Sequence, residues 1–262
     1  MSDTRTLYGF WISPYMATVA QYLMESDLSF DYERVSPYAG ETVSDSHKQR
    51  NPLGKIPSLK EPEGEVISES LAICRYLSRK YPQAHQYYPC HDAEKCAPID
   101  IKSDFITFSI AGPFFNAFVF GAYFPQAFGF RMEQEAALFA ASSVFLIKGA
   151  MGRLMHAAHL TPYLSGDQPN MADFQLFQML QLGKTFEGYF TMPMLNLLHG
   201  DEKLQTFFDA MSERESSQKV LAFQEQEMAL TKTEIFEKFG PAYSKVLERA
   251  KDILPKFFGH EV

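Results

Sequence analysis

Hydrophobic and polar residues in the first part of the chain follow alternately the period of a strand and that of a helix. Apolar runs predict strands at residues 6–11 and 29–35, and residues 14–26 between them have the spacing of an amphipathic helix. Residues 41–50 show only a short helical pattern, so we expect an irregular link there. The pattern predicts a β-α-β unit followed by a connection.

The next part of the chain predicts two strands and a helix. Residues 56–59 and 66–68 are short apolar runs, and residues 69–80 carry an apolar stripe at helical spacing. Proline is tolerated in a sheet at edges, strand starts or bulges. We therefore interpret Pro57 as marking an edge, where the backbone groups of Ile56 stay free for an extended peptide.

The remainder of the chain is predicted to be almost entirely helical. Prolines at positions 82, 89 and 98 indicate a linker over residues 84–98. We expect one domain over residues 1–83 and an all-helical domain with a C-terminal extension over residues 99–262. Within it, apolar residues recur at helical spacing in several segments, namely 99–111, 132–159, 171–186, 204–211 and 233–251.

A stretch from Phe105 to Phe130 contains no charged residue and is long enough to cross a bilayer. Prolines and polar residues interrupt it, and no cluster of basic residues flanks it as in a membrane anchor. We interpret it as a helix that breaks at Gly112-Pro113, followed by a second aromatic helix or loop. Its aromatic side chains exceed what one helix face buries, so some of them are expected to line a pocket.

Composition indicates a folded protein of a reducing, cytoplasmic compartment. With 46% hydrophobic and 21% charged residues among 262, the chain can bury a full core, which excludes a disordered protein. A net charge of −8 removes the electrostatic basis for binding nucleic acid. The three cysteines do not suit a disulfide scaffold, and the first residues lack the apolar stretch of a signal peptide.

The junction between the first predicted strand and the first helix is the candidate site for chemistry. Ser13 is placed to cap the helix, and Pro14 takes the first helical position, where no hydrogen-bonded N–H is lost. A thiolate held there would meet a hydroxyl donor, free backbone N–H groups and the positive end of a helix dipole. Many strand-to-helix turns share this pattern, so the functional interpretation depends on motifs downstream.

Three motifs support that interpretation: residues 10–15 (Phe-Trp-Ile-Ser-Pro-Tyr), 51–57 (Asn-Pro-Leu-Gly-Lys-Ile-Pro) and 67–71 (Ile-Ser-Glu-Ser-Leu). In order and approximate spacing they resemble the N-terminal domain of the cytosolic glutathione transferases, and the first motif is most similar to serine-type members of the tau class. The resemblance implies an α/β thioredoxin-like domain (βαβ-ββα) followed by an all-α domain. In the second half of the chain, far fewer residues support this resemblance.

The resemblance also implies how reduced glutathione, the expected co-substrate, would be bound. Ile56, preceding a cis Pro57, would exchange main-chain hydrogen bonds with the extended cysteinyl residue. Ser70 would bind the γ-glutamyl carboxylate, and Glu69 would compensate the charge of the ammonium group.

The glycyl end and the sulfur would be bound by other residues. Lys55 is expected near the glycyl carboxylate, with His47 and Lys48 as weaker candidates. Ser13 is the implied catalytic residue, because its hydroxyl would donate to the sulfur anion. Lowering a thiol pKa from about 8.5 by one to two units takes about 1.4 to 2.7 kcal/mol, within reach of one hydroxyl bond and a helix dipole.

The sulfur anion would attack an apolar electrophile held in an aromatic pocket. Candidate lining residues come from both predicted domains, namely Trp11, Tyr15, Phe108, Phe114, Phe115 and Phe118. Family resemblance implies a homodimer with the site near the two-fold interface. We expect no nucleic acid, membrane or metal partner.

Other reactive residues have simpler interpretations. Tyr8 lies inside an apolar strand, and Cys74 falls on a helix stripe and is expected in the core. Cys90, His91 and Cys96 match no standard zinc spacing and lack a fourth ligand. We interpret these three as linker residues.

Residues 164–173 predict a capped helix in the second domain. Asn170 is placed to cap its N-terminus, and Asp173 can return a hydrogen bond to the backbone of Asn170. The segment resembles the capping motif of the glutathione transferase helical domain. It supports the fold and does not indicate a substrate.

Three functions are compatible with these patterns. The first is a glutathione S-transferase that conjugates the thiol to an apolar electrophile. The second is a glutathione-dependent lyase, isomerase or dehalogenase, such as the aryl-ether-cleaving relatives with long C-terminal segments like residues 225–262. The third is a non-enzymatic binding protein that keeps the fold.

Overall fold

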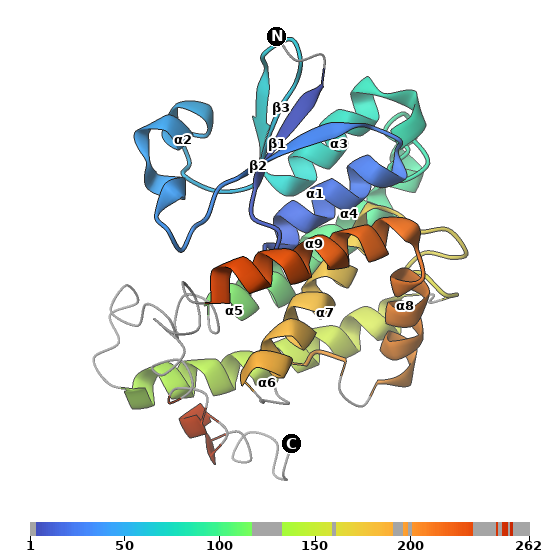
Figure 1. Cartoon of the computed structure of the whole chain (residues 1–262). Helices are drawn as coiled ribbons and strands as arrows, with labels where there is room; N and C mark the ends of the chain where they lie inside the picture. Colours follow the sequence, from blue (N-terminus) through green and yellow to red (C-terminus); the bar gives the residue numbers. More distant parts are fainter. Residues whose placement is uncertain are drawn as a thin grey trace.

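The computed structural model describes residues 4–116, 133–158, 161–190, 196–198, 201–232, 245, 248–250 and 252–253. Figure 1 shows a small sheet flanked by helices, placed above longer helices from later parts of the chain. The architecture is a thioredoxin-like mixed sheet followed by a helical domain, which confirms the predicted fold class.

The sheet has the strand order β2-β1-β3-β4. β1 (Arg5–Gly9) is parallel to β2 (Phe30–Arg34) and antiparallel to β3 (Ser58–Lys60), and β3 is antiparallel to β4 (Val66–Ser68). Four of the five residues of the inner strand β1 are buried, whereas β2 alternates between half-buried and exposed residues, as expected for an edge strand. The predicted strands are all present, with ends shifted by one or more residues.

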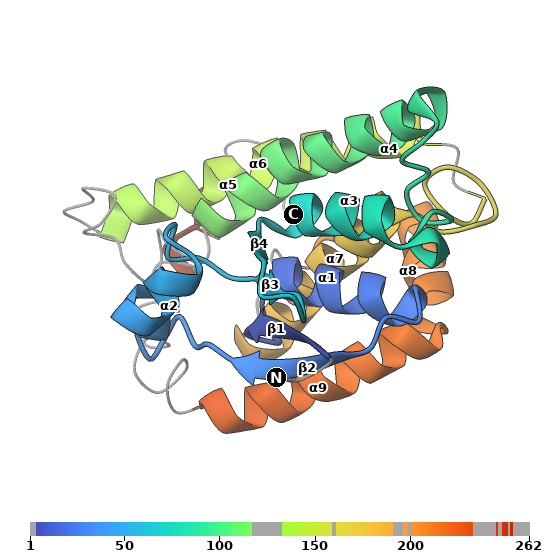
Figure 2. The same cartoon turned by 90° about the horizontal axis from the view of Figure 1, so that it is seen from above.

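Helices α1 (Pro14–Glu25) and α3 (Ser70–Lys80) pack against each other beside the sheet (Figure 2). Their apolar stripes are buried there, as the helical spacing predicts. The expected link contains a short turn, η1 (Glu41–Val43), and the helix α2 (Asp45–Arg50). The β-α-β, link, β-β-α order is therefore confirmed.

The connection to the second domain is shorter than we expected. A single turn, η2 (Pro82–Ala84), follows α3, and helix α4 (Ala93–Phe105) begins inside the segment 84–98 predicted as a linker. Asp92 caps α4, since its side chain accepts from the backbone N–H three residues later. The prediction failed because Pro98 was interpreted as a helix breaker, whereas it lies within α4 on an exposed position.

The predicted break at Gly112-Pro113 is also wrong. The turn η3 (Ile106–Ala111) is π-helical, and α5 (Gly112–Phe114) follows it with the backbone still in the right-handed helical region. A π-helical turn widens the backbone locally, which relieves the clash between a proline ring and the carbonyls of the preceding turn. The aromatic segment beyond residue 116 lies outside the described residues until residue 133.

The second domain is arranged around α7 (Met171–Phe190), which packs against α1 of the first domain. Near it lie α6 (Glu133–Ala157), α8 (Glu202–Ser212) and α9 (Glu215–Lys232) (Figures 1 and 2). The predictions of α6, α7 and α8 are confirmed. The predicted helix over residues 233–251 falls largely outside the described residues.

Helix α9 is a helix that the hydrophobic pattern did not identify. Its buried positions include polar residues, namely Ser216, Ser217, Gln224, Glu227 and Thr231. A helix whose buried face is partly polar has no clear hydrophobic period. The hydrophobic pattern of the sequence therefore does not predict α9.

Residues Glu135–Ala157 of α6 are long and apolar enough to cross a membrane, with a mean hydropathy of 1.3. Half of this window is buried inside the protein. Leu138, Phe145 and Leu146 are its exposed large side chains among the described residues. Because core helices of water-soluble proteins have the same length and composition, α6 does not by itself indicate a membrane span.

Asn170 and Asp173 form the predicted capping box at the start of α7. The Asn170 Oδ1 atom accepts from the N–H of Ala172 at 2.9 Å, and Asp173 Oδ2 accepts from the N–H of Asn170 at 2.9 Å. Asp173 Oδ1 also accepts from the N–H of Leu164 at 2.7 Å. The fully buried Asp173 therefore ties the preceding loop to the helix.

An Asp173→Asn variant is expected to lose part of the pH dependence of stability. Burial raises the pKa of the Asp173 carboxyl to about 7, although backbone donors at Leu164 and Asn170 oppose the shift. A raised pKa stabilises the fold below the unfolded value of about 3.9, and this contribution is lost as the pH rises to about 7. The amide side chain of the variant cannot ionise, so urea unfolding should show a flatter profile. The prediction would be contradicted if the difference in the free energy of unfolding between the wild type and the variant were constant between about pH 5 and pH 8.

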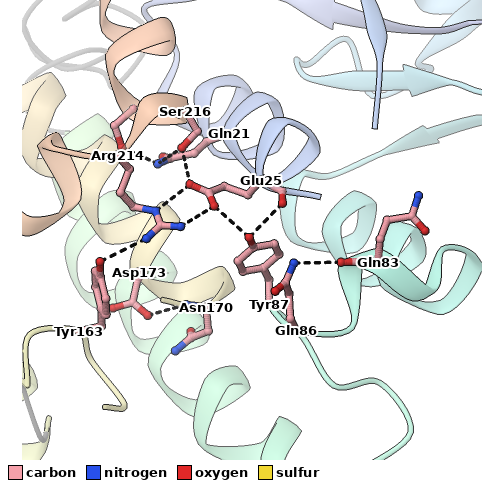
Figure 3. A network of polar contacts seen from close by, with 11 residues as sticks. Gln21, Glu25, Gln83, Gln86, Tyr87, Tyr163, Asn170, Asp173, Arg214 and Ser216 are labelled. Atoms are coloured by element: carbon pink, nitrogen blue, oxygen red, sulfur yellow. Dashed lines mark hydrogen bonds and ion pairs between the residues drawn. The ribbon is translucent and has the colours of Figure 1, made fainter. Parts of the chain in front are cut away.

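Polar side chains join the two domains at the end of α1 (Figure 3). Glu25 pairs with the guanidinium of Arg214 at 2.6 and 2.7 Å and accepts from the hydroxyls of Tyr87 at 2.9 Å and Ser216 at 2.5 Å. Gln21, one turn earlier on α1, donates to Ser216 at 3.3 Å. Burial opposes ionisation of Glu25, but hydrogen bonds from Arg214 and Ser216 outweigh it and lower the pKa of this carboxyl.

A second contact fixes the other end of α9 on the sheet. Glu227 of α9 accepts from the hydroxyl of Tyr32 at 2.9 Å and pairs with Arg34 at 2.7 Å, and both partners lie on β2. The Glu227 side chain is only 2% exposed. The position of α9 is therefore fixed against both α1 and the edge strand.

Candidate functional site

The register of the sheet brings three distant segments to one end of it. Tyr8 of β1 lies opposite Ser58 of β3, which lies opposite Ser68 of β4. The chain after β1, the chain before β3 and the chain after β4 therefore leave the sheet at the same end. These segments carry the predicted site residues, namely Ser13, Lys55, Ile56, Pro57, Glu69 and Ser70.

Ser13 occupies the N-cap of α1, as predicted. Its Oγ atom accepts from the N–H of Met16 at 3.5 Å, and Pro14 begins the helix. The hydroxyl hydrogen is not used in this bond and can be donated to an anion. Ser13 is half-buried, so a bound group at the positive end of the helix dipole can reach it.

The turn before β3 is held in one shape by a buried histidine. The Ile56–Pro57 peptide bond is cis. The carbonyl oxygen of Lys55 accepts from Asn51 Nδ2 at 2.7 Å and lies 2.9 Å from His47 Nε2. His47 is fully buried, so it supports this turn and is not placed to bind the glycyl end from solvent. The spacing of His47 in the sequence does not indicate that its side chain supports this turn.

The structure corrects one detail of this turn. We expected Pro57 to mark an edge of the sheet, but β3 is an inner strand and Pro57 immediately precedes it. Proline is tolerated there because the first residue of a strand needs no ladder donor. Lys55 is exposed and Ile56 half-buried.

Glu69 stands between β4 and α3 in an unusual backbone conformation. Its φ of 69° and ψ of 115° lie in a region that few residues other than glycine adopt. Such strain is found at sites where a side chain must be held in one direction. Glu69 is exposed, and Ser70 begins α3, where backbone N–H groups have no partner within the helix.

Tyr15 connects this site to the second domain. Burial and the nearby Glu69 carboxylate raise the pKa of the Tyr15 hydroxyl to about 12. The Tyr15 ring also lies 5.1 Å from the ring of Phe115, centroid to centroid. Two of the predicted pocket residues are thus brought together at the start of α1.

The other predicted pocket residues lie in different environments. Trp11 is buried between Tyr32 and Phe223, and it lines a groove of about 740 Å³ between β2 and α9. Phe114 is fully buried, and the side chain of Phe108 is 76% exposed. Phe118 lies outside the described residues.

The alternative reactive residues are in the sheet and the core. Tyr8 is buried in β1, with the guanidinium of Arg50 over its ring at 4.4 Å. Burial is the main cause of the raised pKa of the Tyr8 hydroxyl. Cys74 is fully buried, which confirms the predicted core position, and burial raises the pKa of its thiol.

Comparison with known proteins assigns the first domain. Residues 7–85 match the family described as the glutathione S-transferase N-terminal domain. Glutathione S-transferase theta-1 of Bos taurus is 35% identical over 79 residues, which are 30% of this chain and 32% of the bovine protein. The chain thus spans about a third of the length of the first curated relatives that it matches.

Longer matches extend into the helical domain. Glutathione S-transferase 1 of Dianthus caryophyllus is 29% identical over 193 residues, covering 72% of this chain and 82% of that protein. A glutathione transferase homologue from Sulfitobacter, solved with bound glutathione, has a TM-score of 0.69 at 18% identity and covers 84% of this chain and 98% of that one. The fold therefore extends over both domains.

Proposed function

We infer that this chain is a member of the cytosolic glutathione transferase superfamily and that it binds reduced glutathione beside Ser13. The bound thiolate then attacks an apolar electrophile. The main support for this proposal is that three features lie at one end of the sheet, namely the Ser13 cap, the cis Ile56–Pro57 turn and the helix start at Glu69-Ser70.

Glutathione has one group for each of these three features. Ile56 precedes β3 and lies outside its two ladders, so its main chain can exchange hydrogen bonds with the extended cysteinyl residue. The γ-glutamyl carboxylate binds to the hydroxyl and N–H of Ser70 at the start of α3, where the helix dipole favours a negative charge. Glu69 compensates the ammonium group, and the exposed Lys55 compensates the glycyl carboxylate.

Ser13 then lowers the pKa of the bound thiol. The Ser13 Oγ atom accepts from a backbone N–H, and its hydrogen is donated to the sulfur. This bond and the α1 dipole stabilise the thiolate, which carries the nucleophilic electron pair. The thiol proton passes to solvent. The sulfur electron pair forms the new bond to the electrophilic carbon, the bond from this carbon to its leaving group breaks, and the leaving group departs with that electron pair.

The electrophile lies against the aromatic pair Tyr15 and Phe115. These rings belong to different domains, so the substrate would be enclosed where the two domains meet. Apolar surface there favours a hydrophobic substrate, but it does not specify the carbon skeleton. Family resemblance supports a homodimer.

Calorimetry with reduced glutathione, followed by an assay with a chromogenic electrophile, tests the proposal. We expect binding and conjugation. If the protein turns over only substrates for elimination or isomerisation, it is a glutathione-dependent lyase or isomerase and not a conjugating transferase. Binding without turnover would indicate a binding protein, and absence of binding would overturn the proposal.

A Glu69→Gln variant is expected to bind glutathione about tenfold more weakly, a loss of about 1.4 kcal/mol. Glutamine keeps the size of the side chain but removes the charge that compensates the ammonium group. Glu63→Gln is the matched control, because Glu63 is also exposed on the first domain and pairs with Lys80 away from the site. Equal affinities in the two variants would show that Glu69 does not contact the tripeptide.

A further inference from the structure

Two histidines and a cysteine gather at the connection between the domains. The ligand atoms of His85, Cys90 and His91 all lie within 4.8 Å of one another. The rings of the two histidines are 4.7 Å apart, centroid to centroid, and nearly perpendicular. From the sequence we considered Cys96 together with Cys90 and His91, but the fold brings in His85 instead.

We propose that His85, Cys90 and His91 form a binding site for a zinc ion. Nitrogen and sulfur ligand atoms around tetrahedral zinc are about 3.3 to 3.5 Å apart, since Zn–N and Zn–S bonds are about 2.0 and 2.3 Å long. The separations of the three ligand atoms, all within 4.8 Å, therefore exceed the spacing that zinc requires by at most about 1.5 Å. Side-chain rotation at a partly exposed surface accommodates a shift of this size.

The ligand chemistry selects the metal. A thiolate and two imidazoles are soft or borderline donors that suit zinc, whereas magnesium and calcium prefer oxygen ligands. When zinc binds, a bond forms between the metal and Cys90 Sγ, and the thiol proton is released to water. The charge of the ion does not change, so no oxidant or reductant is needed.

The backbone that carries the ligands is held on both sides. The carbonyl of Tyr87 accepts from the N–H of Met171 at 3.0 Å, and the carbonyl of Tyr88 accepts from the hydroxyl of Ser78. The N–H of Cys90 in turn bonds the Tyr88 carbonyl at 2.8 Å. A site on a fixed backbone loses little conformational entropy when the ion binds.

Burial leaves one coordination position to solvent. His85 and Cys90 are half-buried and His91 is exposed. Water can therefore complete a tetrahedron whose other three positions are protein ligands. The Cys90 thiol donates to the carbonyl oxygen of Ser78 on α3 at 3.4 Å, so the sulfur is positioned from the first domain. Zinc binding replaces this hydrogen bond when the thiol proton is released.

A zinc ion at this site would cross-link residues of the interdomain connection. His85 follows η2, and Cys90 and His91 come immediately before the residue that caps α4. A zinc ion bound to all three holds the end of the first domain to the start of the second. Because zinc would bind the folded chain preferentially, it should raise the unfolding temperature.

Zinc titration of the reduced, untagged full chain against a chromogenic chelator tests the site. We expect about one tightly bound ion, and with cobalt in place of zinc a sulfur-to-metal charge-transfer band. Cys90→Ser should abolish the band, and His85→Ala or His91→Ala should weaken zinc binding by more than about 100-fold. Absence of the band in the wild-type chain would overturn the proposal.

Two control variants separate this site from chance binding. His156→Ala removes an exposed histidine of α6, and Cys96→Ser removes the neighbouring thiol. Both should bind zinc like the wild type, and a loss equal to that of His91→Ala would contradict the assignment. Should a ligand variant fail to fold, protection of Cys90 from alkylation by zinc in the wild-type chain gives the same answer. Glutathione binding does not enter either measurement.

Discussion

Replacing Ser13 by alanine is expected to lower kcat by tens of fold or more, a loss of at least about 2 kcal/mol of transition-state stabilisation. In the proposed function the Ser13 hydroxyl would donate to the sulfur anion, and the variant lacks it. The pKa of the thiol of bound glutathione should therefore rise toward the free value of about 8.5. The affinity for glutathione should stay nearly intact, because the turn at Ile56 and the helix start at Ser70 are unchanged. Steady-state kinetics and an ultraviolet titration of the bound thiolate measure both effects.

Ser13 is also a helix cap, so its loss must be separated from a loss of stability. Removing a cap costs about 1 kcal/mol. Asp201→Ala is the matched control, since Asp201 caps α8 by accepting from the N–H of Leu204 at 3.0 Å. It should lose a comparable amount of stability without losing turnover. Ser13→Thr, which keeps the hydroxyl, should retain activity, whereas unchanged turnover in Ser13→Ala would show that another group stabilises the sulfur.

An Arg214→Ala variant is expected to lower the free energy of unfolding by about 3 to 5 kcal/mol. The side chain of Glu25 is only 8% exposed, and its carboxylate would be left without its cationic partner. The hydroxyls of Tyr87 and Ser216 would remain as donors, but neutral donors stabilise a buried charge less than a guanidinium does. Urea unfolding measures the loss.

The pair between Arg75 and Asp100 is the matched control for this result. Arg75 Nη2 lies 2.6 Å from Asp100 Oδ1, the same distance as in the Glu25 pair, but the Asp100 side chain is 33% exposed. Arg75→Ala should therefore cost at most about 1 kcal/mol. Equal losses in the two variants would show that burial of Glu25 does not determine the strength of the interdomain contact.

The first domain could be predicted from sequence because its signals are local. Strand and helix periods alternate over short segments. Ser13 followed by Pro14 is a common helix N-terminus whose recognition needs no distant contact. Ser13, Pro57 and Glu69 were identified from motifs, and the register of the sheet brings their segments together. The support from His47 was missed, since a buried histidine that holds a neighbouring turn has no characteristic spacing.

The second domain was predicted less well because its deciding contacts are distant in sequence. Pro98 and Pro113 suggested helix ends, but one lies on an exposed helix position and the other follows a π-helical turn. Helix α9 has a buried face that includes serine, glutamine and glutamate, and the partners of these polar side chains lie on α1, α7 and β2. His85 is brought to Cys90 and His91 by the fold of the connection after η2.

The long-range nature of the interdomain contacts bears on how the chain folds as it is synthesised. Gln21 and Glu25 are separated from their partners Ser217 and Arg214 by 196 and 189 residues. The sheet and α1 emerge from the ribosome long before α9 exists, so these side chains must stay hydrated while most of the chain is translated. The first domain reaches its final stability late, and the nascent chain is most vulnerable to proteases and chaperone capture during that interval.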